Sequence, residues 1–600
     1  MNDLSDTCVL VLGLGESGLA MARWCARLGA SVRVWDSREA PPHRAALAEH
    51  VPGAQWVRGA LTDAAFEGVH LVLKSPGLSP RDMRIAGPLG RAAESGMRVR
   101  GELELFAHAL ADLKTERGYA PHVLAVTGTN GKTTTTALTA LLIARAGRRV
   151  AVAGNIGPTM LQTLADALDR EPVAGVGPSC DPVPGAGDDV PVSRSGEEAD
   201  APDETFDAGA VSPSGDTGPE ADGRVDAEGE VLPGAAGQVS EVVTPPAPAP
   251  VFEHLPEVWV LELSSFQLDG AQDFEPSAAT VLNITQDHLD WHGSMEAYVA
   301  AKARVFGRTA VMVINRDDPV VERMVPEPVQ ERSARGRPAR TVGRSVVRFG
   351  LDAPRRPGDF GLVEENGMAW LVRALEADET LSRSRTRRAG ATAEPAEELH
   401  IQRLMPADAL RVRGRHNAAN ALAALALASA IGCPLAPMLH GLREYTGEPH
   451  RVQLIASLDG VDAFDDSKGT NVGATVAALM GLGADRSPAR LVVILGGDGK
   501  GQDFAPLAEP VRRHARAVAL IGRDAARIEA ALGHTGVALQ HHDSLEAATR
   551  WCFAQARSGD AVLLSPACAS LDMFRNYAHR AEVFAAEVRS VVADRGGVVA

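Results

Sequence analysis

Residues 122–134 read HVLAVTGTNGKTT, and the expected fold class follows from this stretch. The apolar run is typical of a buried strand, the turn after it contains glycines, and a helical pattern begins near Lys132. A turn of this kind directs backbone N–H groups at phosphates, while Lys132 would neutralise phosphate charge and Thr133 would bind Mg²⁺. The spacing departs from GxxxxGK[ST], because residue 126 is Val where that pattern has Gly. A purely structural turn is the weaker interpretation, because a run of threonines is a costly way to start a helix.

Strands of the same kind recur on both sides of this loop. CVLVLG, VRVWD and HLVLKSPG precede it, AVAGN, VWVLELS, ATVLNI and AVMVIN follow it, and LVVILGG, AVALIGR and AVLLSP lie near the C-terminus. Strands that alternate with helical patterns indicate parallel α/β domains, and 600 residues exceed one hydrophobic core. We therefore predict an α/β protein with three domains. They are a Rossmann-like domain at 1–100, a central ATPase-type domain with the phosphate loop at 101–446, and a second Rossmann-like domain at 447–600.

The first block opens with a second glycine loop. Gly13-Leu14-Gly15-Glu16-Ser17-Gly18 has the GxGxxG pattern between a strand and a helix, and Asp36 ends the next strand. Such a loop brings backbone N–H groups to a pyrophosphate at a helix N-terminus. The pattern fits a nicotinamide dinucleotide, and it fits the diphosphate of a UDP-sugar equally well. Ser75-Pro76-Gly77 would add a neighbouring loop, although Gly77 also suits a turn that merely needs glycine.

One long segment has a different composition from the rest. Residues 171–250 contain 17 Asp and Glu against two Arg, which accounts for −15 of the net charge of −17, and they contain 13 prolines. Such a segment cannot bury enough apolar surface to offset its ordering entropy, so we predict a disordered acidic insertion in the central domain. Two arginine-rich stretches, Arg332–Arg344 and Arg383–Arg388, suggest further exposed loops. Nucleic-acid binding is the weaker interpretation, because no aromatic residues alternate with these arginines.

Other features of the composition narrow the class of protein. The six cysteines are scattered without a CxxC pair, which favours reduced thiols over a zinc site or a disulfide framework. The N-terminal MNDLSDT lacks the basic and apolar segments of a signal peptide. No uninterrupted apolar run reaches the ~18 residues that a membrane span needs. We therefore expect a cytoplasmic protein without membrane insertion.

Several motifs together resemble a known family. The loop GTNGKTT resembles the Mur ligase and folylpolyglutamate synthetase superfamily, whose members activate a carboxylate as an acyl phosphate. The other motifs are similar to the branch of Mur ligases that joins D-glutamate to UDP-N-acetylmuramoyl-L-alanine. They are Gly154-Asn155-Ile156-Gly157, Glu262-Leu263-Ser264-Ser265-Phe266-Gln267, Asp287-His288-Leu289-Asp290, Asp466-Ser467-Lys468-Gly469-Thr470-Asn471, Gly496-Gly497-Asp498-Gly499-Lys500 and Ser565-Pro566-Ala567-Cys568-Ala569-Ser570. The DDSKGTN and SPACAS segments discriminate best between this branch and its sister ligases.

The resemblance implies an ATP-dependent amide ligase of peptidoglycan synthesis and assigns its binding residues. The matching positions for ATP are Gly128, Thr129, Asn130, Gly131, Lys132, Thr133, Thr134, Asn420, Arg451 and Asp466. Those for the UDP-sugar are Gly15, Glu16, Ser17, Asp36, Ser37, Arg38, Ser75 and Gly77, with Asn155 at the muramoyl end. Those for D-glutamate are Lys468, Thr470, Lys500, Ser570, Leu571 and Tyr577, and Tyr577 stands where the family more usually has Phe.

The resemblance also implies a metal centre and catalytic residues. Two Mg²⁺ ions are expected, held by Thr133, Glu262, His288 and Lys302, with Lys302 carbamylated by CO₂ so that it offers oxygen to a hard cation. Lys132, His288 and Lys302 are the expected catalytic residues, although His288 is not assigned as the general base. Without the resemblance, Lys302 would be interpreted as an ordinary surface lysine on the helix SMEAYVAAKARVF.

Three other functions compete with this one. A nicotinamide-dependent oxidoreductase would explain the GxGxxG loop but would leave the ATP loop and the third block without a purpose. A sister ligase that adds another amino acid is the nearer rival, and a non-catalytic descendant is the third. The expected partners are the two substrates alone, with a monomeric enzyme and no nucleic acid.

Overall fold

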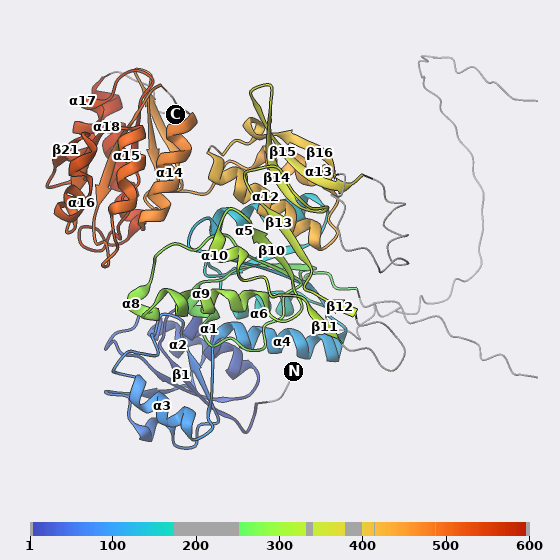
Figure 1. Ribbon diagram of the computed structural model, residues 1–600. Helices are drawn as coiled ribbons and strands as arrows, with labels where there is room; N and C mark the ends of the chain where they lie inside the picture. Colours follow the sequence, from blue (N-terminus) through green and yellow to red (C-terminus); the bar gives the residue numbers. More distant parts are fainter. Residues whose placement is uncertain are drawn as a thin grey trace, which may run out of the picture. The chain divides into compact units, whose positions relative to one another are not determined.

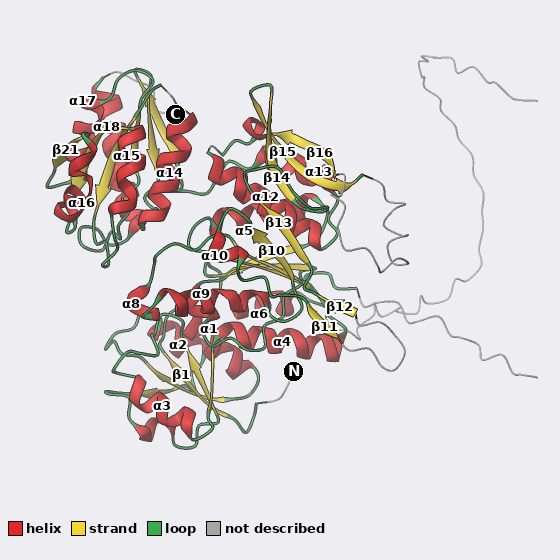
Figure 2. Ribbon diagram, viewed as in Figure 1, coloured by secondary structure: helices red, strands yellow, loops and turns green. Residues whose placement is uncertain are grey.

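The computed structural model describes residues 4–172, 251–331, 340–377, 399–412, 414–485 and 488–595 (Figure 1). The acidic insertion, for which we predict disorder, lies outside the described ranges from residue 173 to residue 250. The arginine-rich stretch Arg383–Arg388 lies outside them as well. Helices and strands alternate along most of the described chain (Figure 2). The predicted α/β class is confirmed, and the chain has three domains of this kind.

The N-terminal domain is a parallel sheet in the order β3-β2-β1-β4-β5. Strands β1 and β4 are neighbours, and the chain leaves them toward opposite edges of the sheet. A crevice at the carboxyl ends of two such strands is where α/β sheets bind ligands. The elements are β1 (Cys8–Leu12), α1 (Glu16–Arg27), β2 (Ser31–Trp35), α2 (Arg44–His50), β3 (Gln55–Val57), η1 (Asp63–Phe66), β4 (Leu71–Lys74), α3 (Ala86–Glu94) and β5 (Arg98–Arg100).

The central domain contains a parallel sheet in the order β13-β10-β9-β6-β8-β7. The alanine-rich helix α12 is buried over most of its length in the same apolar cluster as α5. The elements are α4 (Glu102–Arg117), β6 (His122–Thr127), α5 (Lys132–Arg145), β7 (Val150–Gly154), α6 (Met160–Arg170), β8 (Val258–Glu262), α7 (Ser265–Leu268), β9 (Ala278–Val281), α8 (Leu289–His292), α9 (Met295–Ala303), η2 (Arg304–Phe306), β10 (Val311–Asn315), α10 (Pro319–Glu322), β13 (Val346–Phe349), η3 (Ala407–Ala409), α12 (Arg415–Ala430) and α13 (Leu435–Glu444).

The central domain also contains antiparallel strands that the parallel pattern did not predict. Strands β14 (Phe360–Glu365), β15 (Met368–Glu376) and β16 (Leu399–Pro406) form an antiparallel sheet. Strands β11 (Val329–Glu331) and β12 (Arg340–Val342) pair with each other. The exposed-loop interpretation of Arg332–Arg344 is therefore wrong at its C-terminal end. Arg344 itself donates hydrogen bonds to the carbonyls of Phe306, Gly307 and Ala310, because its guanidinium closes the turn after η2.

The C-terminal domain has a sheet in the order β17-β18-β22-β19-β20-β21, in which only the β17–β18 pair is antiparallel. Its strands β19 and β22 are fully buried apolar runs, and β20 is buried and apolar except at Arg516, as expected when helices cover both faces of a sheet. The elements are β17 (Gln453–Leu458), β18 (Val461–Asp465), α14 (Val472–Asp485), β19 (Leu491–Gly496), η4 (Ala505–Leu507), α15 (Ala508–His514), β20 (Ala515–Ile521), α16 (Ala525–Leu532), η5 (Gly533–Thr535), β21 (Ala538–His541), α17 (Leu545–Gln555), β22 (Ala561–Leu564) and α18 (Tyr577–Asp594).

The two ends that flank the acidic insertion are held together. One oxygen of the Glu171 carboxylate accepts from the backbone N–H of Glu253 at 2.6 Å. The other oxygen accepts from His254 and Leu255 at 2.7 and 2.9 Å. Burial alone would raise the pKa of Glu171, but these three hydrogen bonds outweigh it and lower the pKa. Glu171 therefore keeps the two ends of the insertion close together.

Candidate active site

The phosphate loop joins β6 to α5 as the sequence predicts. Gly128 and Gly131 have φ values of +150° and +83°, a backbone conformation that favours glycine. A Cβ atom at Gly131 would lie 2.6 Å from the side-chain oxygen of Asn420, so this turn must also pass close to α12. Asn130 is held from the next strand, because its N–H donates to Asn283 Oδ1 at 2.8 Å and its carbonyl accepts from Asn283 Nδ2 at 3.0 Å. The loop is thus shaped by groups outside itself.

Two lysines meet on this loop. Lys132 Nζ donates to the carbonyls of Gly128 and Thr129 at 3.0 and 2.8 Å. Lys302 Nζ reaches the same Gly128 carbonyl from α9 at 2.8 Å, and it also donates to Thr127 Oγ1 at 3.3 Å. Burial is the main cause that lowers the pKa of both amines, and that of Lys302 is lowered well below its usual value. Two cations beside this glycine loop would favour a polyanion there.

Lys302 is 2% exposed, so its interpretation as an ordinary surface lysine is wrong. Its ammonium lies 4.8 Å from the centre of the Tyr298 ring, one helical turn earlier. The Tyr298 hydroxyl in turn shares a 3.0 Å hydrogen bond with Thr129 Oγ1 in the phosphate loop. Tyr298 was not predicted as a site residue, although the i, i+4 spacing to Lys302 places the two side chains on one face of the helix.

Glu262 ends β8 beside the phosphate loop. It pairs in register with Val126 of β6 and Gly154 of β7, so three carboxyl strand ends meet here. The Glu262 side chain is 1% exposed, and its Oε1 accepts from the Asn155 amide at 2.8 Å. Its Oε2 is buried and has no hydrogen-bond partner among the described residues. A buried carboxylate oxygen without a partner is costly unless a cation satisfies it.

The buried, unpaired oxygen of Glu262 and the hydroxyl of Thr133 fit a bound Mg²⁺ ion. The Thr133 hydroxyl accepts a 2.6 Å hydrogen bond from Arg451 in the segment before β17. Carboxylate and hydroxyl oxygens are the ligands that this hard cation takes in nucleotide sites, where phosphate and water supply the rest. Within the described ranges, no group of three or more His, Cys, Asp or Glu residues is placed to hold a metal by itself. The donor set therefore suits an ion that a nucleotide helps to bind.

His288 occupies an unusual backbone conformation with φ +53° at the start of α8. Its ring meets the Phe266 ring edge-on, with 4.7 Å between centroids, and its Nε2 lies 3.5 Å from Asp287 Oδ2. Burial is the main cause that lowers the pKa of His288. The positive charges of Lys500, Lys132 and Lys302 lower this pKa further, whereas the negative charge of Asp287 raises it. A neutral imidazole is therefore favoured near neutral pH, which suits a metal ligand.

The glycine loop of the N-terminal domain is built for close approach. A Cβ atom at Gly18 would lie 1.9 Å from the Gly13 carbonyl, so helix α1 starts close to the end of β1. The same carbonyl accepts from Ser75 Oγ at 2.8 Å, which joins the two predicted loops. Gly15 and Ser17 are half-buried and Glu16 is exposed at this helix start, while Gly77 is exposed with open space around its Cα.

Asp36 is already engaged by protein groups. It accepts from the Leu14 N–H at 2.6 Å and from two guanidinium nitrogens of Arg38 at 2.9 and 2.8 Å. Burial alone would raise the pKa of Asp36, but these hydrogen bonds outweigh it and lower the pKa. A groove of about 750 Å³ lies beside it and is lined by Trp35, Asp36, Ser37, Arg38, Glu39, Arg44, Trp56, Val57, Arg58, Gly59, Ala60, Leu61 and Arg84.

The residues predicted for the nucleotide come together around a small cavity of about 80 Å³. It is lined by Asn130, Gly131 and Thr134 of the phosphate loop and by Asn420, Arg451, Asp466 and Lys468, among others. His416 and Asn417 line it as well and were not predicted. Burial raises the pKa of Asp466 to about 7, opposed by a 2.7 Å hydrogen bond from Ser565 and by the charge of Arg451.

The residues predicted for D-glutamate lie on segments that meet in the C-terminal domain. Lys468 Nζ lies 4.9 Å from the centre of the Tyr577 ring, and Ser467 Oγ donates to the Tyr577 carbonyl at 2.8 Å. Ser570 is buried, whereas Leu571 and Lys500 are exposed. Thr470 follows Lys468 in a tight turn in which its N–H donates to the Lys468 carbonyl at 2.9 Å. The structure brings Lys468 against Tyr577 and records no direct contact between Thr470 and Ser570.

A buried arginine that the sequence did not reveal joins these segments. Arg580 is fully buried and donates to Ser467 Oγ at 3.0 Å, to the Ser467 carbonyl at 2.7 Å and to the Cys568 carbonyl at 3.1 Å. Burial lowers the pKa of this guanidinium to about 10. Its position inside α18 gave no signal, because an arginine in a helix is usually exposed.

Relatives match almost the whole chain, and family models match three separate parts of it. The models match as "Mur ligase MurD-like, N-terminal domain" over residues 7–101, "Mur ligase middle domain" over 245–335 and "Mur ligase, glutamate ligase domain" over 450–568. A UDP-N-acetylmuramoylalanine--D-glutamate ligase of Albidiferax ferrireducens is 54% identical and covers 99% of this chain and 98% of that protein. The ligase of the same name from Paraburkholderia phymatum is 49% identical and covers 100% and 99%.

Solved structures match more distantly. The MurF ligase of Thermotoga maritima in complex with ADP is 14% identical with a TM-score of 0.47, and it covers 98% of this chain and 100% of that one. In the described ranges, no helix is both long and apolar enough to cross a membrane.

Two relatives share about half of their residues with this chain over nearly the full length of both proteins. This chain therefore belongs to the Mur ligases.

Proposed function

We propose that this chain is the ATP-dependent ligase that joins D-glutamate to UDP-N-acetylmuramoyl-L-alanine in peptidoglycan precursor synthesis. The observation that carries the chemistry is the meeting of Lys132 and Lys302 on the Gly128 carbonyl beside the unsatisfied oxygen of Glu262. The names of the relatives that match over nearly their full length support the choice of substrates. The products are the amide, ADP and phosphate.

The reaction first brings two anions together. The carboxylate of the UDP-muramoyl-alanine attacks the γ-phosphorus of ATP, the bond to the β,γ-bridging oxygen breaks, and ADP leaves from an acyl phosphate. Lys132, half-buried at the N-terminus of α5, stabilises the charge on the transferring group, and the loop N–H groups orient it. The amine of D-glutamate then attacks the acyl carbon and loses a proton, and phosphate departs from the tetrahedral intermediate.

Mg²⁺ would be held by Glu262 and Thr133, with a second ion at His288 and a carbamylated Lys302. Bound Mg²⁺ supplies charge neutralisation at the phosphates. The carbamate proposal is supported by the burial of Lys302, because the neutral amine is the form that reacts with CO₂. A carbamate on Lys302 would supply oxygen ligands, which Mg²⁺ prefers.

Substrate positions follow the predicted residues. We place UDP at Gly15, Glu16, Ser17, Asp36, Ser37, Arg38, Ser75 and Gly77, with Asn155 at the muramoyl end. We place the ATP base and ribose at Asn420, Arg451 and Asp466, and D-glutamate at Lys468, Thr470, Lys500, Ser570, Leu571 and Tyr577. The divisions near residues 100 and 446 then separate a UDP-sugar domain, an ATP domain and an amino-acid domain. We further infer a cytoplasmic monomer without a nucleic-acid partner.

The test is amino-acid-dependent phosphate release with UDP-N-acetylmuramoyl-L-alanine, ATP and Mg²⁺. D-glutamate, L-alanine, diaminopimelate, L-lysine and L-glutamate are compared at equal concentration. Turnover with D-glutamate alone supports the proposal, and turnover with another member of the panel would assign a sister activity. An oxidoreductase would instead change the fluorescence of NADH, for which we expect no effect.

A further inference from the structure

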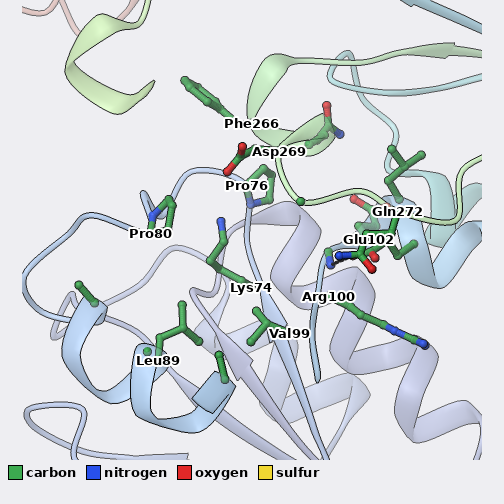
Figure 3. Close-up of a pocket in the computed structure, with 18 residues that line it drawn as sticks. Lys74, Pro76, Pro80, Leu89, Val99, Arg100, Glu102, Phe266, Asp269 and Gln272 are labelled. Carbon is green, nitrogen blue, oxygen red and sulfur yellow. Dashed lines mark hydrogen bonds between the residues drawn. The ribbon is translucent and has the colours of Figure 1, made fainter. Parts of the chain in front are cut away.

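A groove at the edge of the N-terminal sheet is not used by the proposed reaction. It has a volume of about 390 Å³ and lies between α3, the ends of β4 and β5, the start of α4, and α7. Figure 3 shows the Lys74 side chain rising from β4 toward Pro76 and Asp269, above Leu89 and Val99, whereas Arg100 points away. Much of the wall is apolar, and its charged residues are Lys74, Arg100, Glu102, Glu104 and Asp269.

Lys74 lies on the opposite face of the sheet from the glycine loop. Side chains alternate along a strand, and Val72 packs with Leu89 on the α3 side, whereas Leu73 packs with Met21 on the α1 side. Lys74 therefore belongs to the α3 side, and Ser75, which contacts Gly13, belongs to the α1 side. A diphosphate bound at the start of α1 would not fill this groove.

The Lys74 ammonium has no carboxylate partner among the described residues. Its Nζ donates one hydrogen bond, to the Leu78 carbonyl at 2.8 Å, and it lies 5.6 Å from the centre of the Trp291 ring. The charge of Asp269 acts on the Lys74 ammonium, and Asp269 is itself paired with Arg304 at 3.2 Å. An ammonium has three donors, so two remain for a ligand.

The other two acids of the groove each accept a hydrogen bond from a backbone N–H, although Oε2 of Glu102 has no hydrogen-bond partner among the described residues. Glu104 accepts from the Gly101 N–H at 3.1 Å in the cap of α4. Glu102 accepts from the Leu161 N–H at 3.1 Å at the start of α6. Neither forms an ion pair with Lys74, so the cation remains available to an anion that enters from solvent.

The opposite wall is made of small residues. Ala86, Gly90 and Ala93 follow one face of α3 at i, i+4 and i+7 and leave room beside Leu89. A Cβ atom at Gly90 would contact nothing within 4 Å. A flat or branched apolar group would fit against this wall while its charged end reaches Lys74.

We propose that this groove is a second ligand site, for a small anion with an apolar body of the aryl or alkyl carboxylate or sulfonate class. The anion binds Lys74 Nζ, and the body packs against α3. Phe266 lines the groove and also meets the His288 ring at 4.7 Å, and Trp291 lies beside both Phe266 and Lys74. An occupant therefore changes turnover through the position of His288.

The probe is 1-anilinonaphthalene-8-sulfonate, an anion with an aromatic body whose fluorescence rises in apolar surroundings. It is titrated into the full chain in the absence of substrates, so the result does not depend on the proposed activity. Lys74→Met removes the charge at similar volume and should weaken binding ~tenfold or more. Lys74→Arg should retain binding, and Lys114→Met, at an exposed lysine of α4, is the matched control.

A second variant blocks the groove without touching Lys74. Gly90→Leu adds a side chain into open space on a helix, so it should fold and abolish the Lys74-dependent binding. Saturating probe should change the turnover of the parent enzyme and leave that of Gly90→Leu unchanged. Equal affinity for the parent and Lys74→Met overturns the proposal. Displacement of the probe by UDP also overturns it, because the groove would then belong to the nucleotide-sugar site.

Discussion

The side-chain amide of Asn155 donates a 2.8 Å hydrogen bond to one carboxylate oxygen of Glu262, and the other oxygen of Glu262 is buried without a partner in the described part of the chain. Asn155 therefore fixes the direction in which Glu262 presents its free oxygen. The backbone reinforces this arrangement, because the Asn155 N–H donates to the Glu262 carbonyl at 2.8 Å. A residue predicted to contact the sugar thus also orients the predicted metal ligand.

Asn155→Ala should raise the Mg²⁺ concentration needed for half-maximal turnover by ~tenfold, as expected when a group that orients a metal ligand is lost. The measurement is phosphate release across a Mg²⁺ titration at saturating substrates. A change in the apparent KM of the UDP-sugar alone would show that Asn155 acts only on the sugar.

Lys132→Ala should lower turnover ~100-fold or more while the fold is retained. The cause is the loss of a cation held against the transferring phosphoryl group. Steady-state phosphate release measures the loss, circular dichroism checks the fold, and Lys114→Ala on the exposed face of α4 is the control. Near-normal turnover of Lys132→Ala would contradict the role of the phosphate loop.

Lys302→Ala should be nearly inactive, because the proposed carbamate is a ligand of the second ion. A short carboxylic acid such as acetate, added to the buffer, should restore part of the rate to Lys302→Ala and none to Lys132→Ala. Full activity of Lys302→Ala would remove this residue from the metal site. Mass spectrometry of the intact parent protein under CO₂ provides a readout that is independent of activity.

Lys468→Ala should mainly raise the apparent KM for D-glutamate, because Lys468 is expected to pair with a carboxylate of this substrate. Discrimination against an amino acid that leaves buried polar groups unpaired can reach ~10⁴. Initial rates over a range of D-glutamate concentrations separate KM from kcat. If kcat falls and KM stays unchanged, Lys468 acts on the reaction step instead.

Deletion of residues 173–249, with the ends joined by a few Gly and Ser residues, should leave kcat within ~threefold. Glu171 already binds the backbone N–H groups of Glu253 and Leu255, so the two ends that the shorter connection must join are already close together. A tenfold shorter loop should gain ~2 kcal/mol of stability at most. Kinetics of the full-length and deleted proteins at low and high salt provide the measurement. A salt dependence that only the full-length protein shows would indicate that the acidic segment regulates the site.

Much of the parallel framework could be predicted because buried strands carry continuous apolar runs, as in VWVL of β8 and LVVILG of β19. The antiparallel strands were not predicted, although the turns that join them carry a recognisable sequence pattern. Asn366-Gly367 joins β14 to β15 and Asp459-Gly460 joins β17 to β18, and all four residues have positive φ. Asn-Gly and Asp-Gly between apolar runs are the strongest short-range signals for a hairpin.

The site was less predictable than the fold, because burial depends on partners that are distant in sequence. Lys302 ends a short helix and gives no sign of being buried, yet it donates to the carbonyl of Gly128, 174 residues earlier. Arg580 is hidden in the same way by Ser467 and Cys568. Only the family resemblance pointed to Lys302, and nothing pointed to Arg580.

The left-handed backbone of His288 has a thermodynamic consequence for the whole enzyme. A residue with a Cβ atom at φ +53° costs ~1–2 kcal/mol relative to an ordinary conformation, and glycine would not incur this cost. Selection for heat resistance alone would thus favour His288→Gly, which relaxes the chain and removes the ring. Under the proposed role of His288 at the second ion, the ligase must keep this strained residue, and thermostable variants must gain their stability elsewhere.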